Sequence, residues 1–231
     1  MLKILAVGPH PDDVEFGCAP VLIQEVQRGN QTKILVLTKG EAATSGTPED
    51  REQEARNAAR KIGAEIGFME LGGDCHLLHT PENSIAIARE IRTYRPAIVL
   101  APHLDENQHP DHVAAGRMIR DAARFARYGG LDELRGLGPH GIGHLYFYSI
   151  TQSFGAQPDV LIDTSAVEEQ WEAAMLCHQT QMKTKSYIDL VKARAKFLGS
   201  AIGTSSAIGL WVNDPIRLES ISDLELSSRN Y

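Results

Sequence analysis

Several features that would reveal a function at once are missing from this chain of 231 residues. Its three cysteines, Cys18, Cys75 and Cys177, are odd in number and widely spaced, which predicts neither a disulfide framework nor a CxxC metal site. No apolar run approaches the length of a membrane span, and the apolar start at residues 1–5 is too short for a signal peptide. The sequence therefore predicts a cytoplasmic protein with reduced thiols and no membrane contact.

Positive charge is also scarce. The 23 lysines and arginines are scattered and are outnumbered by 30 acidic residues, so the formal net charge is -7. Because nucleic-acid binding usually needs a concentrated basic face, we expect no nucleic-acid partner. The first predicted strand is followed by "GPHPDD" and not by G-x-G-x-x-G, which excludes a dinucleotide-binding Rossmann protein.

Strand and helix signals alternate along most of the first 150 residues. This alternation predicts a doubly wound, mostly parallel α/β sheet flanked by helices, a Rossmann-like fold. The chain shows no linker or repeat, and its length suits a single domain over residues 1–231. The predicted strands are 2–7, 33–37, 66–71, 97–101 and 145–148, and the predicted helices are 19–28, 48–63, 84–94, 113–128, 168–177 and 187–197.

Histidines and aspartates follow two of these strands. His10, Asp12 and Asp13 come directly after the first strand, and His109 and His112 follow the strand that ends near residue 101. Ligands of an open parallel sheet bind beyond the carboxyl ends of its strands, so both segments should reach one edge. Imidazole and carboxylate groups without a thiolate suit a catalytic zinc or iron(II) that keeps one open position.

The spacing within each of the two segments indicates that its polar residues have different roles. Asp12 and Asp13 are neighbours that point different ways, so one can ligate a metal while the other faces a substrate. His109 and His112 lie three apart around a proline, so only one need touch the metal. Each segment alone could instead be a turn or a helix cap. Two His-Pro-Asp segments after two strands of one sheet favour the metal site.

The two segments also resemble a known family. "HPDDVEFG" and "HPDHVAAG" resemble the two metal motifs of the LmbE-like, or PIG-L, zinc-dependent N-deacetylases. "DREQEARNAARKIG" (50–63), "LVKARAKFLGSAIG" (190–203) and the overall length resemble the branch that deacetylates N-acetylglucosaminyl-malate in bacillithiol biosynthesis. The resemblance implies the LmbE-like deacetylase fold and hydrolysis of an N-acetyl group on an N-acetylglucosamine-type conjugate.

The same resemblance implies roles for the site residues. The zinc ligands would be His10, Asp13 and His112, with Fe²⁺ as the alternative metal. Asp12 would be the general base, and a protonated His109 would lie beside the developing oxyanion. Which of these two protonates the leaving amine is left open. Asp111 is expected to keep His109 charged, because an adjacent carboxylate raises the pKa of a histidine.

Two further residues are predicted to contact the substrate. Arg51 would grip the malate carboxylates, and Glu15 would contact sugar hydroxyls. Their alternatives are a solvated arginine paired with a neighbouring glutamate and a first-turn helix charge. The resemblance also implies a homo-oligomer, a trimer or hexamer, with a small sugar conjugate as substrate. His103 is a candidate partner of the ligands, and the residues expected to shape the pocket are Asp74, His76 and His79.

One stretch departs from the family pattern. Many members have Tyr-Ala-Glu after the Ile-Gly that matches residues 202–203, whereas this chain has Ser206-Ala207-Ile208. The missing hydroxyl and carboxylate leave the exact substrate open, with another amino-sugar conjugate or a chitooligosaccharide as alternatives. A non-catalytic sugar-binding module is the remaining hypothesis, and the intact Asp12 and His109 argue against it.

Overall fold

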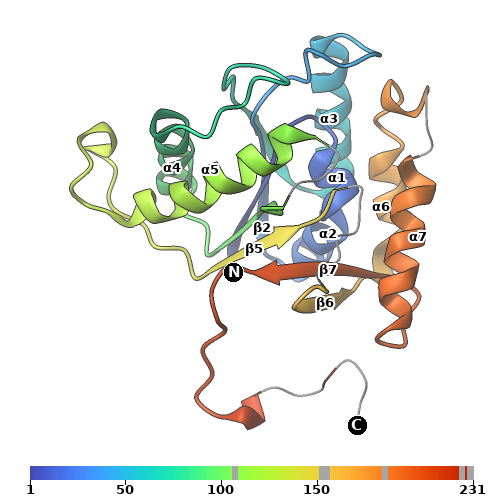
Figure 1. Ribbon diagram of the computed structural model, residues 1–231. Helices are drawn as coiled ribbons and strands as arrows, with labels where there is room; N and C mark the ends of the chain where they lie inside the picture. The colour runs from blue at the N-terminus through green and yellow to red at the C-terminus, as the bar shows by residue number, and fades with distance from the viewer. Residues whose placement is uncertain (106–108, 151–156, 184–186, 224–226, 228–231) are drawn as a thin grey trace.

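The computed structural model describes residues 1–105, 109–150, 157–183, 187–223 and 227. Within these residues, seven strands join one sheet in the order β3-β2-β1-β4-β5-β7-β6 (Figure 1). None of the described helices is long and apolar enough to cross a membrane. The strands are β1 (Lys3–Gly8), β2 (Gln31–Val36), β3 (Glu65–Phe68), β4 (Ile98–Pro102), β5 (His144–Tyr148), β6 (Val160–Asp163) and β7 (Ala207–Val212).

Helices cover both faces of the sheet. On one side lie α4 and α5, and on the other lie the remaining helices (Figure 1). The helices are α1 (Asp13–Gly17), α2 (Ala19–Gln27), α3 (Pro48–Ile62), α4 (Pro81–Tyr94), α5 (Pro110–Arg127), α6 (Glu168–Met175) and α7 (Tyr187–Ser200). The predicted α/β fold with a helix-flanked, mostly parallel sheet is confirmed.

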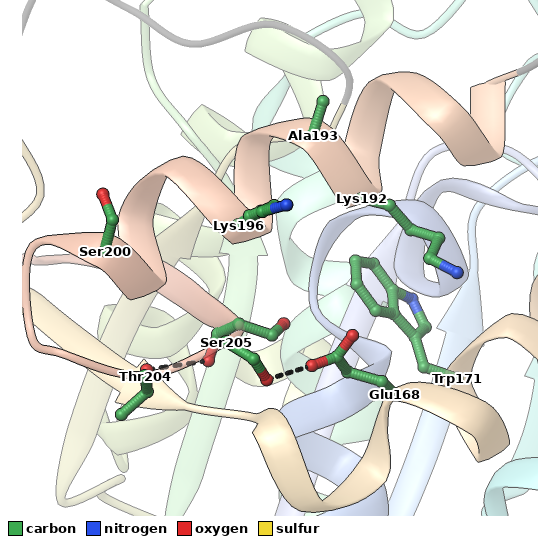
Figure 2. A pocket seen from close by; sticks show the side chains of 9 residues that line it. Glu168, Trp171, Lys192, Ala193, Lys196, Ser200, Thr204 and Ser205 are labelled. Carbon is green, nitrogen blue, oxygen red and sulfur yellow. Dashed lines mark hydrogen bonds between the residues drawn. The ribbon is translucent and has the colours of Figure 1, made fainter.

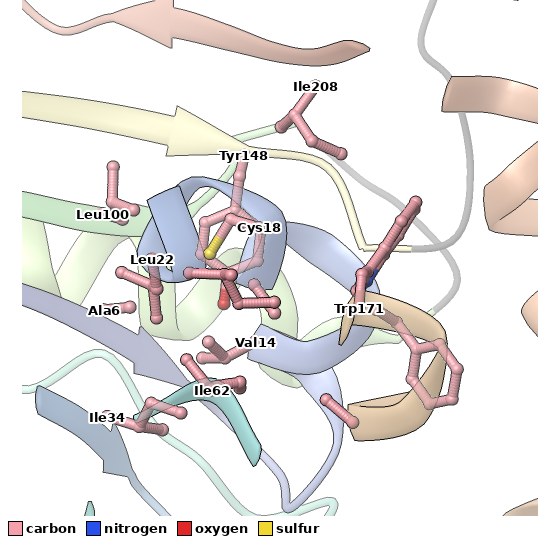
Figure 3. Close-up of a cluster of buried hydrophobic side chains, with 14 of the residues drawn as sticks. Ala6, Val14, Cys18, Leu22, Ile34, Ile62, Leu100, Tyr148, Trp171 and Ile208 are labelled. Atoms are coloured by element: carbon pink, nitrogen blue, oxygen red, sulfur yellow. The ribbon is translucent and has the colours of Figure 1, made fainter. Parts of the chain in front are cut away.

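Alternation along the strands explains the two layers of core. In β1, Ile4 and Ala6 pack into one apolar cluster while Leu5 and Val7 pack into the other. Successive strand residues point to opposite faces, so a strand buried on both sides must be apolar throughout. The first cluster, part of which is drawn in Figure 3, places Tyr148 of β5 among residues of α1, α2 and α6.

The last two strands are the part that the sequence analysis missed. β7 pairs with β5 and with β6, antiparallel in both cases, whereas the five strands before them pair in parallel. β6 has only four residues and lies at the sheet edge, yet three of them, at positions 160–162, are apolar. β7 is apolar apart from Gly209, so both strands carry a local signal that was overlooked, and only helices were predicted in the last third of the chain.

Arg92 of α4 stabilises the end of α5 and the loop after it. Its guanidinium is buried and donates to the carbonyl oxygens of Ala126 at 2.9 Å, Leu134 at 3.0 Å and Leu137 at 2.7 Å. Ala126 and Leu134 also accept the backbone N–H of His140 and of Leu137, so the guanidinium adds a second donor to these carbonyls and ties the end of α5 to the loop after it.

Replacing Arg92 with methionine should lower the free energy of unfolding by about 3 kcal/mol or more. Methionine keeps the apolar stem but removes several charge-assisted hydrogen bonds, each worth about 1.5–3 kcal/mol. Urea unfolding measures the loss. The matched control is Arg89→Met on the same helix, where the side chain is exposed and a change of less than about 1 kcal/mol is expected. Equal losses in the two variants would contradict the capping role of Arg92.

Candidate functional site

The carboxyl ends of neighbouring strands bring the two His-Pro-Asp segments together. β1 and β4 are adjacent and parallel, with Ala6 opposite Leu100, so the residues that follow them leave the sheet at the same edge. His10 lies in the loop after β1, Asp13 begins α1, and His112 lies in the first turn of α5. The sheet therefore joins residues that are about one hundred positions apart in the sequence.

Asp13 lies between the two histidines. Its carboxylate oxygens are 3.0 Å from Nδ1 of His10 and 3.2 Å from Nε2 of His112. One candidate ligand atom from each residue lies within 4.8 Å of the others, and their exposed fractions are 7%, 4% and 4% for His10, Asp13 and His112. We call these three residues the ligand cluster.

Two further carboxylates, those of Asp74 and Asp111, lie against His10. Nε2 of His10 is 3.1 Å from a carboxylate oxygen of Asp74 and 3.1 Å from one of Asp111. These residues and His109 form a second set of closely spaced candidate ligand atoms. Asp74 follows β3 and was expected only to shape the pocket. Its place after a third strand of the same sheet is the signal that could have added it to the site.

The charges of this region favour a cation. Burial would lower the pKa of His10, but Asp13, Asp111 and Asp74 outweigh burial and raise it well above its usual value. Burial would likewise raise the pKa of Asp13, but His112 and His10 hold it well below its usual range. Two histidines and a carboxylate are a donor set suited to a divalent metal such as zinc. The residues present therefore fit a metal ion.

Asp12 has an unusual backbone that separates it from its neighbour. Its φ of 127° lies in a region that residues with a Cβ rarely adopt, and its side chain makes no helix-cap hydrogen bond. One carboxylate oxygen lies 3.3 Å from Nη2 of Arg51. Burial raises the pKa of Asp12 to about 6, although Arg51 acts in the opposite direction. A carboxylate with a pKa near neutrality is suited to accept a proton.

Arg51 is turned into the protein. It lies in the first turn of α3, whose N-terminus is fixed by reciprocal capping between Thr47 and Asp50. The guanidinium donates to the carbonyl oxygens of Gly40 at 3.1 Å and Pro11 at 2.9 Å, and 4% of the residue is exposed. A Cβ on Gly40, at φ +69°, would lie 1.9 Å from Nη1 of this arginine, so only glycine fits there.

These contacts bear on the predicted substrate role of Arg51. We expected a guanidinium free to grip a carboxylate, but the structure directs it to the turn that carries Asp12. The solvated alternative does not describe it either, because the side chain is buried. The geometry favours a positioning role, and contact with a substrate carboxylate stays a prediction.

His109 is the N-cap of α5, and this position determines which ring nitrogen carries the proton. Nδ1 accepts the backbone N–H of Asp111 at 3.2 Å, so a neutral ring carries its proton on Nε2. Nε2 lies 3.5 Å from Sγ of Cys75 and 3.7 Å from Asp74, toward the site. The arrangement offers an N–H donor beside the ligand cluster.

The geometry does not favour the expected imidazolium form of His109, which stays a prediction. Burial and the nearby His10 lower the pKa of His109, and Asp111 only partly opposes them. The Asp111 carboxylate accepts the backbone N–H of Cys75 at 2.8 Å and lies 3.1 Å from His10, but 3.9 Å from Nδ1 of His109. Asp111 therefore supports His10 more closely than His109, and a neutral His109 is favoured.

The other residues that the sequence predicted for the site lie outside the ligand cluster. The Glu15 carboxylate is buried and faces His178 at 3.3 Å, so its predicted contact with sugar hydroxyls stays a prediction that the geometry does not favour. His103 packs its ring edge against Trp211. His79 lies 2.7 Å from Asp121, and His76 contacts the carbonyl oxygen of Asp74. His103 and His79 thus belong to neither set of candidate ligands.

The stretch that departs from the family pattern, residues 206–208, begins at a pocket separate from the ligand cluster. A pocket of about 390 Å³ is bounded by α6, α7 and residues 204–206 (Figure 2). Ser206 borders this pocket and its hydroxyl contacts that of Thr164 at 2.9 Å, while Ile208 packs in the first core cluster. The pocket lining shares no residue with the ligand cluster.

The fold and the site together define a class: an α/β protein with a candidate metal centre at the carboxyl edge of its parallel strands. The chain belongs to the PIG-L family, since the family profile described as GlcNAc-PI de-N-acetylase matches residues 5–123. The predicted family is therefore confirmed, and it is a family of deacetylases.

Individual relatives refine this picture. Diacetylchitobiose deacetylase of Thermococcus kodakarensis is 31% identical over 191 residues, covering 78% of this chain and 70% of the relative. A probable N-acetyl-alpha-D-glucosaminyl L-malate deacetylase 2 of Bacillus anthracis is 27% identical over 131 residues, covering 52% and 58%. The crystal structure of the conserved protein TT1542 from Thermus thermophilus has a TM-score of 0.87 at 35% identity, covering 94% of this chain and 97% of that one.

Proposed function

We propose that this protein is a metal-dependent hydrolase that removes the N-acetyl group from an N-acetylglucosamine-type sugar. The observation that carries the proposal is the turn at residues 12–13, which places Asp13 within the ligand cluster and Asp12 against Arg51. Membership of a deacetylase family supports the reaction class. A pure sugar-binding module would need neither a base nor an oxyanion donor.

We assign the metal to His10, Asp13 and His112, with Zn²⁺ as the proposed ion and Fe²⁺ as the alternative. When bound, such an ion supplies Lewis-acid polarisation of water and of the acetyl carbonyl. Asp12 then takes the proton of the attacking water and can return it to the departing amine. His109 donates from Nε2 to the developing oxyanion, a role that a neutral imidazole can fill.

The acceptor attached to the sugar is the finer question. N-acetylglucosaminyl-malate is the substrate implied by the sequence resemblance, and a chitooligosaccharide is the alternative. Two observations favour the alternative: the match to the diacetylchitobiose deacetylase is longer and more identical, and Arg51 is engaged by Pro11, Gly40 and Asp12. We therefore propose a neutral acetylated disaccharide such as N,N'-diacetylchitobiose as the substrate.

Amine release from the two substrates tests both levels of this proposal. We expect kcat/KM for N,N'-diacetylchitobiose to exceed that for N-acetylglucosaminyl-malate by tenfold or more, and Arg51→Ala to reduce both by similar factors. A charge-assisted hydrogen bond to a malate carboxylate would be worth about 1.5–3 kcal/mol, so a selective loss above roughly tenfold on the malate conjugate would restore the bacillithiol branch. No release from either substrate by metal-loaded protein would reject the proposed hydrolase.

Four broader predictions accompany the proposed enzyme. We propose that the activity resides in a single domain over residues 1–231, because all seven described strands belong to one sheet. Cytoplasmic location and assembly into a trimer or hexamer stay predictions from the sequence. The expected partner is a small sugar conjugate, with neither nucleic acid nor membrane.

A further inference from the structure

The helix that begins with Asp13 is too short to maintain its own geometry. α1 has five residues, and the preceding Asp12 combines a positive φ with the absence of a side-chain cap. Isolated helices of this length are not stable in water, so packing against the rest of the chain must hold the turn. The elements that contact α1 therefore bear directly on where Asp12 and Asp13 lie.

Three residues from the last third of the chain hold α1. Trp171 donates from Nε1 to the carbonyl oxygen of Glu15 at 2.7 Å, and Arg194 donates to that of Phe16 at 3.3 Å. His178 approaches the α1 side chains themselves: its Nε2 lies 3.3 Å from Oε1 of Glu15. Glu15 is 2% exposed and His178 is fully buried, so this ion pair is shielded from water.

The segment 178–181 also holds α3. Thr180 donates from its backbone N–H and its hydroxyl to the two carboxylate oxygens of Glu54, at 2.9 and 2.7 Å. Glu54 is one turn beyond Arg51, the residue that contacts Asp12. One short segment therefore contacts both helices that converge on Asp12.

A third contact reaches the loop before α3. Gln181 donates from Nε2 to the carbonyl oxygen of Ser45 at 3.0 Å. Gly46, at φ +83°, packs so closely that an added Cβ would lie 2.7 Å from the Thr180 side chain. The loop that supplies Gly40 to Arg51 is thus fixed by the same segment.

Stability alone does not account for a buried ion pair at this place. Desolvation offsets much of the attraction between two buried charges, and apolar replacements of similar volume are often neutral or stabilising. The carboxylate of Glu15 and the ring of His178 face each other at 3.3 Å, and Glu15 raises the pKa of His178 although burial acts in the opposite direction. Such a pair fixes the relative orientation of two elements more than it adds to their stability.

We propose that His178, through Glu15, is a positioning residue for the Asp12–Asp13 turn, and that Thr180 and Gln181 position α3 and its loop against the same turn. This role rests on the proposed hydrolase function. In this role, the segment 178–181 keeps Asp12 correctly placed relative to the ligand cluster. The segment does not touch substrate or metal.

Replacing His178 with leucine tests this role by separating turnover from stability. We expect kcat on N,N'-diacetylchitobiose to fall tenfold or more, KM to change less than about twofold, and the melting temperature to stay within a few degrees of wild type. His178→Gln retains an N–H donor toward Glu15 and should recover most of kcat. The visible absorption spectrum of the Co²⁺-loaded protein should shift in His178→Leu, because Asp13 is displaced.

The matched control is His140→Leu. Its imidazole contacts the carbonyl oxygen of Pro96 at 2.7 Å, before β4 and so at the opposite edge of the sheet, and the change should leave kcat and the Co²⁺ spectrum unchanged. A folded His178→Leu with wild-type kcat and spectrum overturns the proposal. If that variant does not fold, Thr180→Val decides by the same readouts. Wild-type protein that binds Co²⁺ but releases no amine rejects the hydrolase function, and the spectral comparison still decides the positioning role.

Discussion

Replacing Asp12 with asparagine is expected to lower amine release by about 10²–10⁴-fold while the bound metal stays at the wild-type level. Asparagine keeps the size of the side chain and can still contact Arg51, but it cannot accept a proton. Asp12 lies outside the His10–Asp13–His112 cluster, so the loss should fall on chemistry. Elemental analysis and fluorescence labelling of the released amine give the two readouts.

The neighbouring aspartate provides the control for this prediction. Asp13→Asn should reduce metal content and activity together, because the Asp13 carboxylate contacts both histidines and an amide is a poorer ligand. The two variants carry the same aspartate-to-asparagine exchange at adjacent positions, so only the position of the change distinguishes them. If Asp12→Asn loses the metal while Asp13→Asn keeps it, the roles of base and ligand are reversed.

Replacing His112 with alanine should weaken metal binding by about 100-fold or more. With three protein ligands there is little redundancy, and loss of even an outer hydrogen-bond partner typically costs about 10–100-fold in metal affinity. Titration of the apoprotein with Zn²⁺ against a competing chelator measures the change, and amine release should fall with occupancy.

His103→Ala is the matched control, because His103 also follows β4 but packs against Trp211 and lies outside the ligand cluster. Its metal affinity should stay within a few-fold of wild type. An unchanged affinity in His112→Ala would remove His112 from the ligand set, and the second set, His10 with Asp74, His109 and Asp111, would then be the better candidate.

The parts of the fold that could be predicted are those specified by short segments. β1 and β4 are near-continuous apolar runs, which is what a strand covered on both faces requires, and α3 carries its own capping residues. β6 and β7 are apolar runs as well, but only helices were predicted in the last third of the chain, and both strands were overlooked. Their antiparallel pairing depends on contacts with β5 that no local pattern specifies.

The sequence by itself determined the chemistry of the site: histidines and aspartates placed directly after two apolar strands, of the residue types that hold a divalent metal. Only the tertiary structure decided which of them meet. It placed His112 against Asp13, brought Asp74 to His10, and directed Arg51 and Glu15 into the protein. Residue type follows from the local sequence, whereas the direction of a side chain depends on how distant elements pack around it. His178 is the clearest example, because its 163-residue separation from Glu15 is closed only by the packing of α6 against α1, α2 and α3.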